Sequence, residues 1–501
     1  MSLLGRVIEG LRAIGRRNAT APGGRRVPIR ARYDAALTTP ENRRHWALAD
    51  GLSADLAAST AVRRQLRNRA RYEVANNSYA RGIVQTLAND CIGTGPRLQL
   101  LGIRGDAARQ IERAFAAWTT AVDLPEKLRS MRVAQAEDGE AFALLTFNPA
   151  LATPVMLDLR LIEAEQIHTP DLPWQDPRAI DGIRFDAAGN PVEYHVLRFH
   201  PGGALGAFPL DYDRVPAAAM IHLFRPDRPG QHRGIPEITP AIPLFAQLRR
   251  FTLAVLGAAE TAADFAGILY TDAPAGGEAD AVEPMDAIAL EKRALLTMPG
   301  GWRMEQMRAE QPATTYAEFK HEILNEIARC LNMPFNVAAG NSSGYNYASG
   351  RLDHQVYFKA IRVDQSRFAM RALDRIFAAW VSEALLIDGF LPEALRSAAT
   401  DWSHQWFWDG SEHVDPAKEA AAQAQRLDSF TTTLADEYAR KGQDWENQLR
   451  QRARELSLMR ELNLQLAVTP GPIIQPAPGP AVPADDSIPT ATEEDADASA
   501  A

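Results

Sequence analysis

The sequence of 501 residues holds only two cysteines, Cys91 and Cys330. Both lie in apolar patterns typical of helices and far apart, so we expect buried free thiols rather than a disulfide, and a reducing, cytoplasmic setting. The sequence also has no run of about 18 apolar residues, so no transmembrane helix is expected. The short apolar stretch at its start is interrupted by Arg6, Glu9 and Arg12, unlike a secretory signal.

The signatures of several catalytic chemistries are missing as well. No G-x-x-x-x-G-K-[ST] run is present, so we do not expect an ATP-driven motor. The ten histidines and two cysteines show no metal-ligand spacing, so we expect neither a metal nor a cofactor. Residues 340–344 match the G-x-S-x-G pattern of serine hydrolases around Ser342. They follow a predicted helix that ends at Pro334, however, whereas the hydrolase nucleophile follows a strand. We therefore predict no enzyme and keep a hydrolase that uses Ser342 as an alternative.

Charged residues are unevenly distributed along the chain. The net charge is −9, yet residues 1–100 hold seventeen Arg and seven acids, while residues 411–501 hold eight basic and sixteen acidic residues. The overall acidity argues against a protein that grips DNA tightly, because such binding requires many cations against phosphates. The basic end is either a solvated face with a flexible arm or a surface for DNA or an acidic partner, and the sequence leaves both interpretations open.

The periodicity predicts an α+β protein dominated by helices. Apolar residues recur at helical spacing before residue 140 and alternate in the middle of the chain. The expected helices cover 53–75, 78–92, 105–119 and 126–138. The expected strands cover 141–147, 155–161, 166–169 and a hairpin at 183–199, and a loop follows at 201–216. Asp138 and Glu140, on either side of Gly139 at a helix end, are expected to be solvated.

Long helices dominate the second half. The segment 236–268 carries Leu248, Phe251 and Val255 at steps of three and four, which predicts one packed stripe close to a heptad seam. Further helices are expected at 314–332, 351–387, 415–440 and 443–466. Residues 295–304 can form a small strand–turn–strand unit. Residues 469–501 contain almost no large apolar groups, so we expect them to be disordered.

Two further segments are rich in aromatic residues. Trp402 and Trp406 lie in a dense aromatic run with few basic neighbours, which favours a core or subunit-interface anchor over a platform for nucleic-acid bases. A loop at 339–350, rich in Gly, Ser, Asn and Tyr, precedes a helix whose basic residues either face phosphates or pair with acids of a neighbouring subunit. These basic residues are Arg351, Lys359, Arg362, Arg367, Arg371 and Arg375.

Several stretches of the sequence together resemble the lambda family of phage portal proteins. They are 71–96, 220–236, 343–351, 414–419 and 442–445, in the order in which the family has them. The most specific is 220–236, which contains the run RPDRPGQHRGIP before a predicted long helix. The resemblance spans roughly residues 30–460.

The resemblance implies a structural function in a phage or prophage particle. A homo-oligomeric ring, typically of about twelve subunits, would stand at one capsid vertex and form the channel for double-stranded DNA. It would dock the terminase large subunit, assemble with major capsid and scaffold proteins, and later join head to tail through head-completion or adaptor proteins. Its place would be the virion, and the host cytoplasm during assembly, with no membrane. The alternatives are another ring-forming head–tail connector and the hydrolase that uses Ser342.

A portal-type fold with wing, stem, clip and crown regions follows from the same resemblance. Its expected parts are a flexible basic arm at 1–45, a wing region at 46–235, a first stem helix at 236–268, a clip at 269–313, a second stem helix at 314–333, a tunnel loop at 334–350, a wing helix with its following segment at 351–412, crown helices at 413–468, and a disordered acidic tail rich in Pro and Ala at 469–501.

Two sets of site residues are predicted within this frame, and neither set is catalytic. The expected channel-facing residues of the tunnel loop are Asn341, Ser342, Ser343, Tyr345, Asn346 and Tyr347. The expected subunit-packing residues are Leu248, Phe251, Val255, Trp402 and Trp406.

Overall fold

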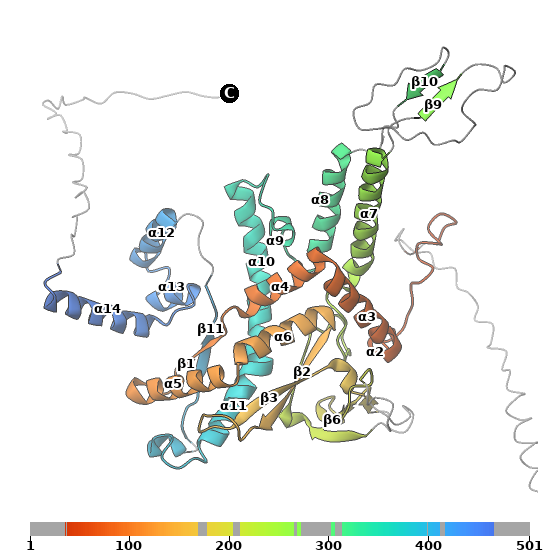
Figure 1. The fold of residues 1–501 in the computed structure, drawn as a ribbon. Coiled ribbons are helices and arrows are strands. Elements are labelled where there is room, and N and C mark those ends of the chain that lie inside the picture. The colour runs from red at the N-terminus through yellow and green to blue at the C-terminus, as the bar shows by residue number, and fades with distance from the viewer. Residues whose placement is uncertain are drawn as a thin grey trace, which may run out of the picture. The chain divides into compact units, whose positions relative to one another are not determined.

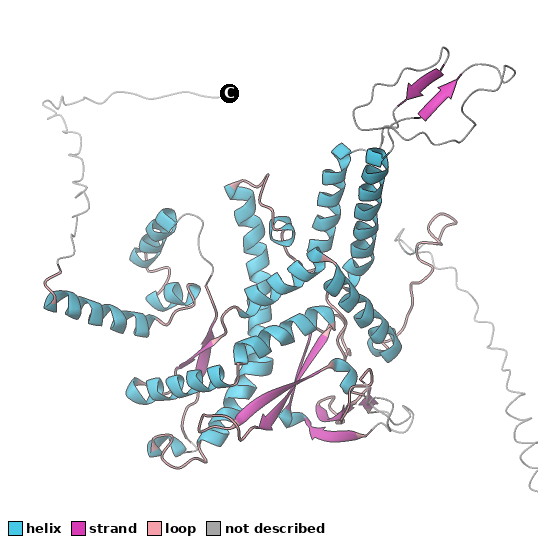
Figure 2. Cartoon of the chain, viewed as in Figure 1, coloured by secondary structure: helices cyan, strands magenta, loops and turns pink. Residues whose placement is uncertain are grey.

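The structure is a computed structural model, and helices make up most of its described part (Figures 1 and 2). It describes residues 36, 38–168, 178–203, 211–264, 268–271, 302–305, 313–397, 399–410 and 416–464. The predicted tail at 469–501, and nearly all of the predicted arm and clip, lie outside the described residues. The chain divides into two units, Met1–Gln85 with Val133–Leu144 and Leu161–Tyr357, and Thr86–Arg132 with Leu145–Arg160 and Phe358–Ala501.

The first unit begins with helices that start where the sequence predicts them. The helix expected at 53–75 is two helices, α2 (Ala54–Ala57) and α3 (Thr60–Asn76). The next, α4 (Ser78–Ile92), has the predicted bounds. Its start is fixed by Asn77, whose side-chain oxygen accepts hydrogen bonds from the backbone N–H groups of Tyr79 and Ala80. None of the helices in the described ranges is long and apolar enough to span a membrane.

Two small sheets follow. The first has the order β3 (Leu157–Ile162), β2 (Glu140–Phe147) and β8 (Met220–Phe224). The second is antiparallel throughout, with the order β4 (Ala179–Ile180), β5 (Ile183–Phe185), β6 (Pro191–Leu197) and β7 (Tyr212–Pro216). The predicted hairpin at 183–199 is confirmed as β5 and β6. Its turn is held by Asp186, whose carboxylate accepts N–H bonds from Ala188 and Asn190.

Two predictions in this region are wrong. The strand expected at 166–169 is a 3-10 turn at Ala164–Gln166, followed by a single bridge from Ile167 to Val196. The loop expected at 201–216 ends in β7, because pairing with β6 places these mainly polar residues in a ladder. An edge strand that buries little shows only a weak alternation of apolar and polar residues, so no local pattern indicated β7.

The long helices of the first unit form a pair. They are α7 (Ile242–Asp264) and α8 (Ala313–Arg329), which Figure 1 shows side by side. The helix expected from 236 starts later, after the 3-10 turn Thr239–Ala241. The strand expected near 302 is confirmed as β10 (Trp302–Glu305), which pairs with β9 (Ile268–Thr271). The other predicted strand of the unit, 295–297, lies outside the described residues.

The second unit has an aromatic core between helices. Its helices include α5 (Gly105–Ala121), most of α6 (Leu124–Glu137) and α11 (Asp374–Ala384), and β1 (Arg97–Leu100) pairs with β11 (His404–Phe407). Phe115 contacts Phe377 and Trp380 edge to face. The helix expected at 351–387 is α10 (Tyr347–Phe368), a π-helical turn at Ala369–Leu373, and α11.

The last described helices are α12 (Pro416–Asp428), α13 (Leu434–Arg440) and α14 (Trp445–Glu461). The sequence predicts a single helix over 415–440, and the structure divides it. Phe430 adopts a positive φ of 56°, and Thr433 and Asp436 form a capping box that starts α13. Arg426 of α12 is ion-paired with Glu437 of α13, which holds the two helices together.

Candidate functional site

The segment that carries the most specific part of the resemblance is a compact loop between β8 and α7. Gln231 organises it, because its side-chain oxygen accepts N–H bonds from Asp227 at 2.8 Å and Arg228 at 3.2 Å. Its amide nitrogen donates to the carbonyl of Arg233 at 2.9 Å. The side chain of Gln231 is buried, so these bonds are protected from water. These hydrogen bonds therefore hold the loop in one defined conformation.

Arg233 is the anchor of this loop, with 1% of its side chain exposed. Its guanidinium donates to both carboxylate oxygens of Glu140, at 2.7 and 2.9 Å, and to the carbonyl of Ile167 at 3.2 Å. Glu140 also accepts the N–H of Gly234 at 3.0 Å and lies 3.2 Å from His222 Nε2. Burial alone would raise the pKa of Glu140, but the Arg233 charge and the hydrogen bonds from His222 and Arg233 hold it well below its usual range.

Two glycines allow this contact. Gly139 has a φ of 91°, in the left-handed region that favours glycine. A Cβ on Gly234 would lie 2.0 Å from the carbonyl oxygen of Gly139, and a Cβ on Gly139 would lie 2.3 Å from the backbone of Ile235. The start of β2 therefore packs backbone against backbone with the loop. The expectation that Asp138 and Glu140 are solvated is wrong, because both are buried here.

Three arginines of α3 complete the network. Arg63, Arg67 and Arg71 follow one another at four-residue steps, which places them on one helix face. Arg67 lies 3.3 Å from both Glu140 and Glu165. Further ion pairs are Arg63–Asp181, Arg67–Asp138, Arg71–Asp138, Arg71–Glu165 and Arg233–Asp181. We call these four arginines (Arg63, Arg67, Arg71 and Arg233) and four carboxylates (Asp138, Glu140, Glu165 and Asp181) the arginine clasp.

The clasp corrects one interpretation of the basic N-terminal region. The sequence leaves its arginines as a solvated face or a surface for DNA, yet Arg63 and Arg67 are buried against carboxylates of the same unit. Burial would raise the pKa of Asp181, but the hydrogen bond from His168 and the charges of Arg233 and Arg63 lower it to about 2. The clasp thus holds ionised groups inside the fold.

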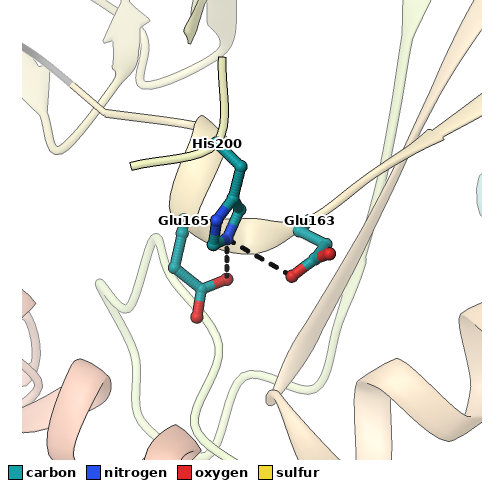
Figure 3. Close-up of side chains that lie close together, drawn as sticks. All are labelled: Glu163, Glu165 and His200. Carbon is teal, nitrogen blue, oxygen red and sulfur yellow. Dashed lines mark ion pairs between the residues drawn. The ribbon is translucent and has the colours of Figure 1, made fainter. Parts of the chain in front are cut away.

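One group of side chains beside the clasp has the composition of a metal site. Glu163, Glu165 and His200 bring one ligand atom each within 4.8 Å of one another. Figure 3 shows the three side chains turned toward one another. Arg67 and Arg71 already contact Glu165, and Arg71 also lies 3.4 Å from Glu163. Two guanidinium charges therefore take the position that a metal ion would need, and the geometry does not support one.

In the sequence, the residues of the clasp all precede the helix pair α7 and α8. The pair is closed by Phe251, whose ring centroid lies 4.5 Å from that of Phe319 and 5.7 Å from that of Tyr316. Leu248 is 3% exposed within the single chain, so little of it remains for a neighbouring subunit. Val255 is half-buried. Leu248 and Phe251 pack within the chain, and the predicted role of all three residues in subunit packing stays a prediction.

The region of the predicted tunnel loop is shorter than expected. A helix, α9 (Phe335–Ala339), occupies the first part of 334–350, so the loop is 340–346. Gly340 ends α9 with a φ of 61°. Of the predicted residues, four are exposed, and Tyr345 is half-buried. The exposed ones are Asn341, Ser342, Ser343 and Asn346.

The two ends of this loop are held by side-chain hydrogen bonds. Asn341 accepts the N–H of Ser343 at 2.9 Å, and Asn346 accepts the N–H of Ser349 at 2.8 Å, which caps α10. Tyr347 is the first residue of α10. Ser342 follows a helix rather than a strand, and in the described part of the chain its hydroxyl has no hydrogen bond to a histidine. The arrangement gives no support to hydrolase chemistry.

The two predicted tryptophans lie in the second unit. Trp406 donates its indole N–H to Asp374 at 2.8 Å, and its ring centroid lies 5.9 Å from that of Phe115. Trp402 contacts Phe377 at a centroid distance of 6.3 Å. Both are half-buried and pack against the aromatic core of the unit, and their predicted role in subunit packing stays a prediction.

The chain is similar to known proteins over most of its length. A family model described as phage portal protein, lambda family, matches residues 41–365. The chain is 24% identical over 430 residues to a probable portal protein of Halomonas phage phiHAP-1, covering 80% of this chain and 81% of that protein. It is 22% identical over 449 residues to portal protein B of Escherichia phage lambda, covering 78% and 83%.

Solved structures with a similar chain were also found. The neck of an empty gene transfer agent particle, computed with C6 symmetry, is 13% identical, has a TM-score of 0.45, and is matched over 70% of this chain and 85% of that one. An HK97 family phage portal protein from Corynebacterium diphtheriae is 11% identical, with a TM-score of 0.30 and coverage of 70% and 98%.

Proposed function

The chain belongs to the lambda family of phage portal proteins, and we propose that about twelve copies of it form a ring around a channel for double-stranded DNA. The ring would dock the terminase large subunit during packaging, take part in capsid assembly, and later join head to tail. The conduit is passive, because the terminase hydrolyses the ATP.

The arginine clasp and the helix pair together are the observation that supports this proposal best. A conduit needs long helices held at a fixed angle while DNA moves past them. The clasp ties the loop before α7 to β2 through Arg233 and Glu140, and Phe251 ties α7 to α8. In the proposed ring, α7 and α8 are the stem helices, β9 and β10 belong to the clip, and 416–464 builds the crown.

The charge of the chain favours DNA that slides through the channel over DNA that is bound tightly. Its net charge is −9, and neutralisation of phosphates by clustered cations is what makes DNA binding tight. Arg63 and Arg67 belong to the basic region for which the sequence leaves DNA contact open. Both pair with carboxylates inside the fold. The exposed loop 340–346 is the segment that we assign to the channel, where small polar side chains let DNA pass.

The loop can be tested without disturbing the clasp. Replacing residues 340–346 with a short Gly-Ser linker removes exposed polar residues that make few contacts outside the loop. We expect rings of normal mass together with reduced DNA packaging or DNA retention in assembled particles. Normal packaging by this variant would contradict the channel role of the loop. An esterase assay on the Ser342→Ala variant, compared with the unmodified chain, tests the hydrolase alternative.

A further inference from the structure

The inference that follows rests on the proposed ring. Copies related by rotation about a ring axis meet through two different surfaces, so each copy must expose two unlike faces that complement each other. In the described part of the chain, α10 and α8 each carry a row of side chains that find no partner within their own copy. The two rows differ in charge.

The outer face of α10 is apolar along its length. Leu352, Val356 and Val363 are 65%, 57% and 55% exposed and, spaced by four and seven residues, lie on one face of the helix. Met370, in the π-helical turn that follows α10, is 62% exposed. The opposite face is buried through Tyr357 and Ile361. Soluble chains rarely leave a continuous row of large apolar side chains in water, so this face is built to be covered.

Basic side chains border this apolar row. Arg351, Lys359 and Arg362 are exposed, and none of them has an ion pair among the described residues. Arg367, one helical turn further, differs because it pairs with Asp364 at 3.1 Å. The three unpaired cations extend over eleven residues, or about 16 Å of helix. The face of α10 is therefore apolar and positively charged.

The outer face of α8 is acidic. Glu318, Glu322 and Glu326 follow at four-residue steps and are exposed, over about 12 Å of helix. Across the described ranges, Glu322 contacts only its neighbour His321, at 3.2 Å, and the other two carboxylates have no ion pair. Phe319 lies next to this row and is 46% exposed. The buried face of α8, with Leu324 and Ile327, points the other way.

We propose that the α10 face of one copy packs against the α8 face of the next copy around the ring, with Arg351, Lys359 and Arg362 opposite Glu318, Glu322 and Glu326. A second copy fits the α10 face better than DNA does, because charged DNA phosphates cannot bury the apolar side chains of this face. The α8 carboxylates would repel phosphates but attract the α10 cations. Such pairs at an interface fix the register and orientation of the partners.

Charge reversal of each face tests the proposal in the full-length chain. The acidic-face variant combines Glu322→Lys with Glu326→Lys, and the basic-face variant combines Lys359→Glu with Arg362→Glu. Each places like charges opposite each other, so we expect the fraction of protein in rings, measured by mass photometry, to fall about tenfold or more. A chain that carries all four changes restores opposite charges, and its ring fraction should return to within about twofold of the unmodified chain.

The control is Glu393→Lys, a reversal of an exposed charge outside α8 and α10, which should leave the ring fraction unchanged. Thermal melting of every variant should match the unmodified chain, because the altered side chains have no buried contacts. Unchanged rings in both double variants, or no recovery in the fourfold variant, overturn this interface while leaving the ring itself standing. Intact rings with altered DNA retention in the basic-face variant also overturn it, and assign α10 to the DNA. An unmodified chain that forms no rings contradicts the proposed function itself.

Discussion

The arginine clasp and the faces of α8 and α10 are made of the same residue types and behave in opposite ways. Arg63, Arg67 and Arg71 on α3, and Glu318, Glu322 and Glu326 on α8, are both rows of like charge at four-residue steps. The α3 row meets carboxylates within the chain. Among the residues that the structure describes, the α8 row has one ion pair, between Glu322 and His321. Burial, and not the charge pattern, separates charges that hold the fold from charges left for a partner.

Removing a buried charge should have the largest effect. Glu140→Gln leaves Arg233, which is 1% exposed, without the carboxylate that neutralises it. We expect the free energy of unfolding to fall by about 3–5 kcal/mol, measured by chemical denaturation. Glu326→Gln is the matched control, since it removes an exposed carboxylate. A loss at Glu140 no greater than that of the control would show that the clasp does not hold the fold.

The backbone contact behind the clasp gives the next largest effect. A Cβ at Gly234 would lie 2.0 Å from a backbone oxygen, so Gly234→Ala forces the backbone to move. We expect a loss of about 1–3 kcal/mol and a lower Tm. At Gly257, inside α7, a Cβ meets nothing within 4 Å, so Gly257→Ala should raise the Tm because alanine favours helix. Equal effects of the same sign would contradict this account.

Glu137, next to Asp138 of the clasp in the sequence, should respond to pH in a defined direction. Burial and Asp138 raise the pKa of Glu137 to about 7. Its unfolded pKa is lower, so the folded chain keeps a proton that the unfolded chain loses, and stability falls as pH rises from about 4.5 to about 7. Glu137→Gln should therefore raise the free energy of unfolding by about 1 kcal/mol at pH 8, after allowance for solvent exposure, and should not raise it at pH 4. A gain at pH 4 alone would contradict the assignment.

Acid acts on Asp181 of the clasp in the opposite sense. The pKa of Asp181 is lowered to about 2, so its contribution to stability is complete above its unfolded value and is lost as pH falls through the folded one. The Tm of the unmodified chain should therefore drop below about pH 4. Asp181→Asn should flatten that acid limb, which a melting series from pH 2 to pH 6 will show.

The smallest expected effect concerns the exposed row on α8. Glu322→Gln removes a carboxylate whose only described contact is with His321. The free energy of unfolding should change by less than about 0.5 kcal/mol, although the same residue is expected to matter for ring formation. Chemical denaturation of the variant at a concentration too low for rings provides the measurement. A loss near that of Glu140→Gln would remove the distinction between the two kinds of charge.

Local sequence predicted the elements well where local forces decide them. The bounds of α4 were predicted because Asn77 caps its start, and the β5–β6 hairpin because Asp186 organises its turn. The clasp was missed because its partners are far apart in sequence. Glu140 and Arg233 are 93 residues apart, and no local pattern reports such a pair. The only available signal was the segment 225–236 itself, which the resemblance singled out without its physical reason.

The ring is the central claim, and its most direct test is the mass of the purified full-length chain together with negative-stain images. The account predicts particles of about 660 kDa, close to twelve times the 55.0 kDa of one chain, with a central hole. A population that remains at 55.0 kDa at every protein concentration tested would contradict it.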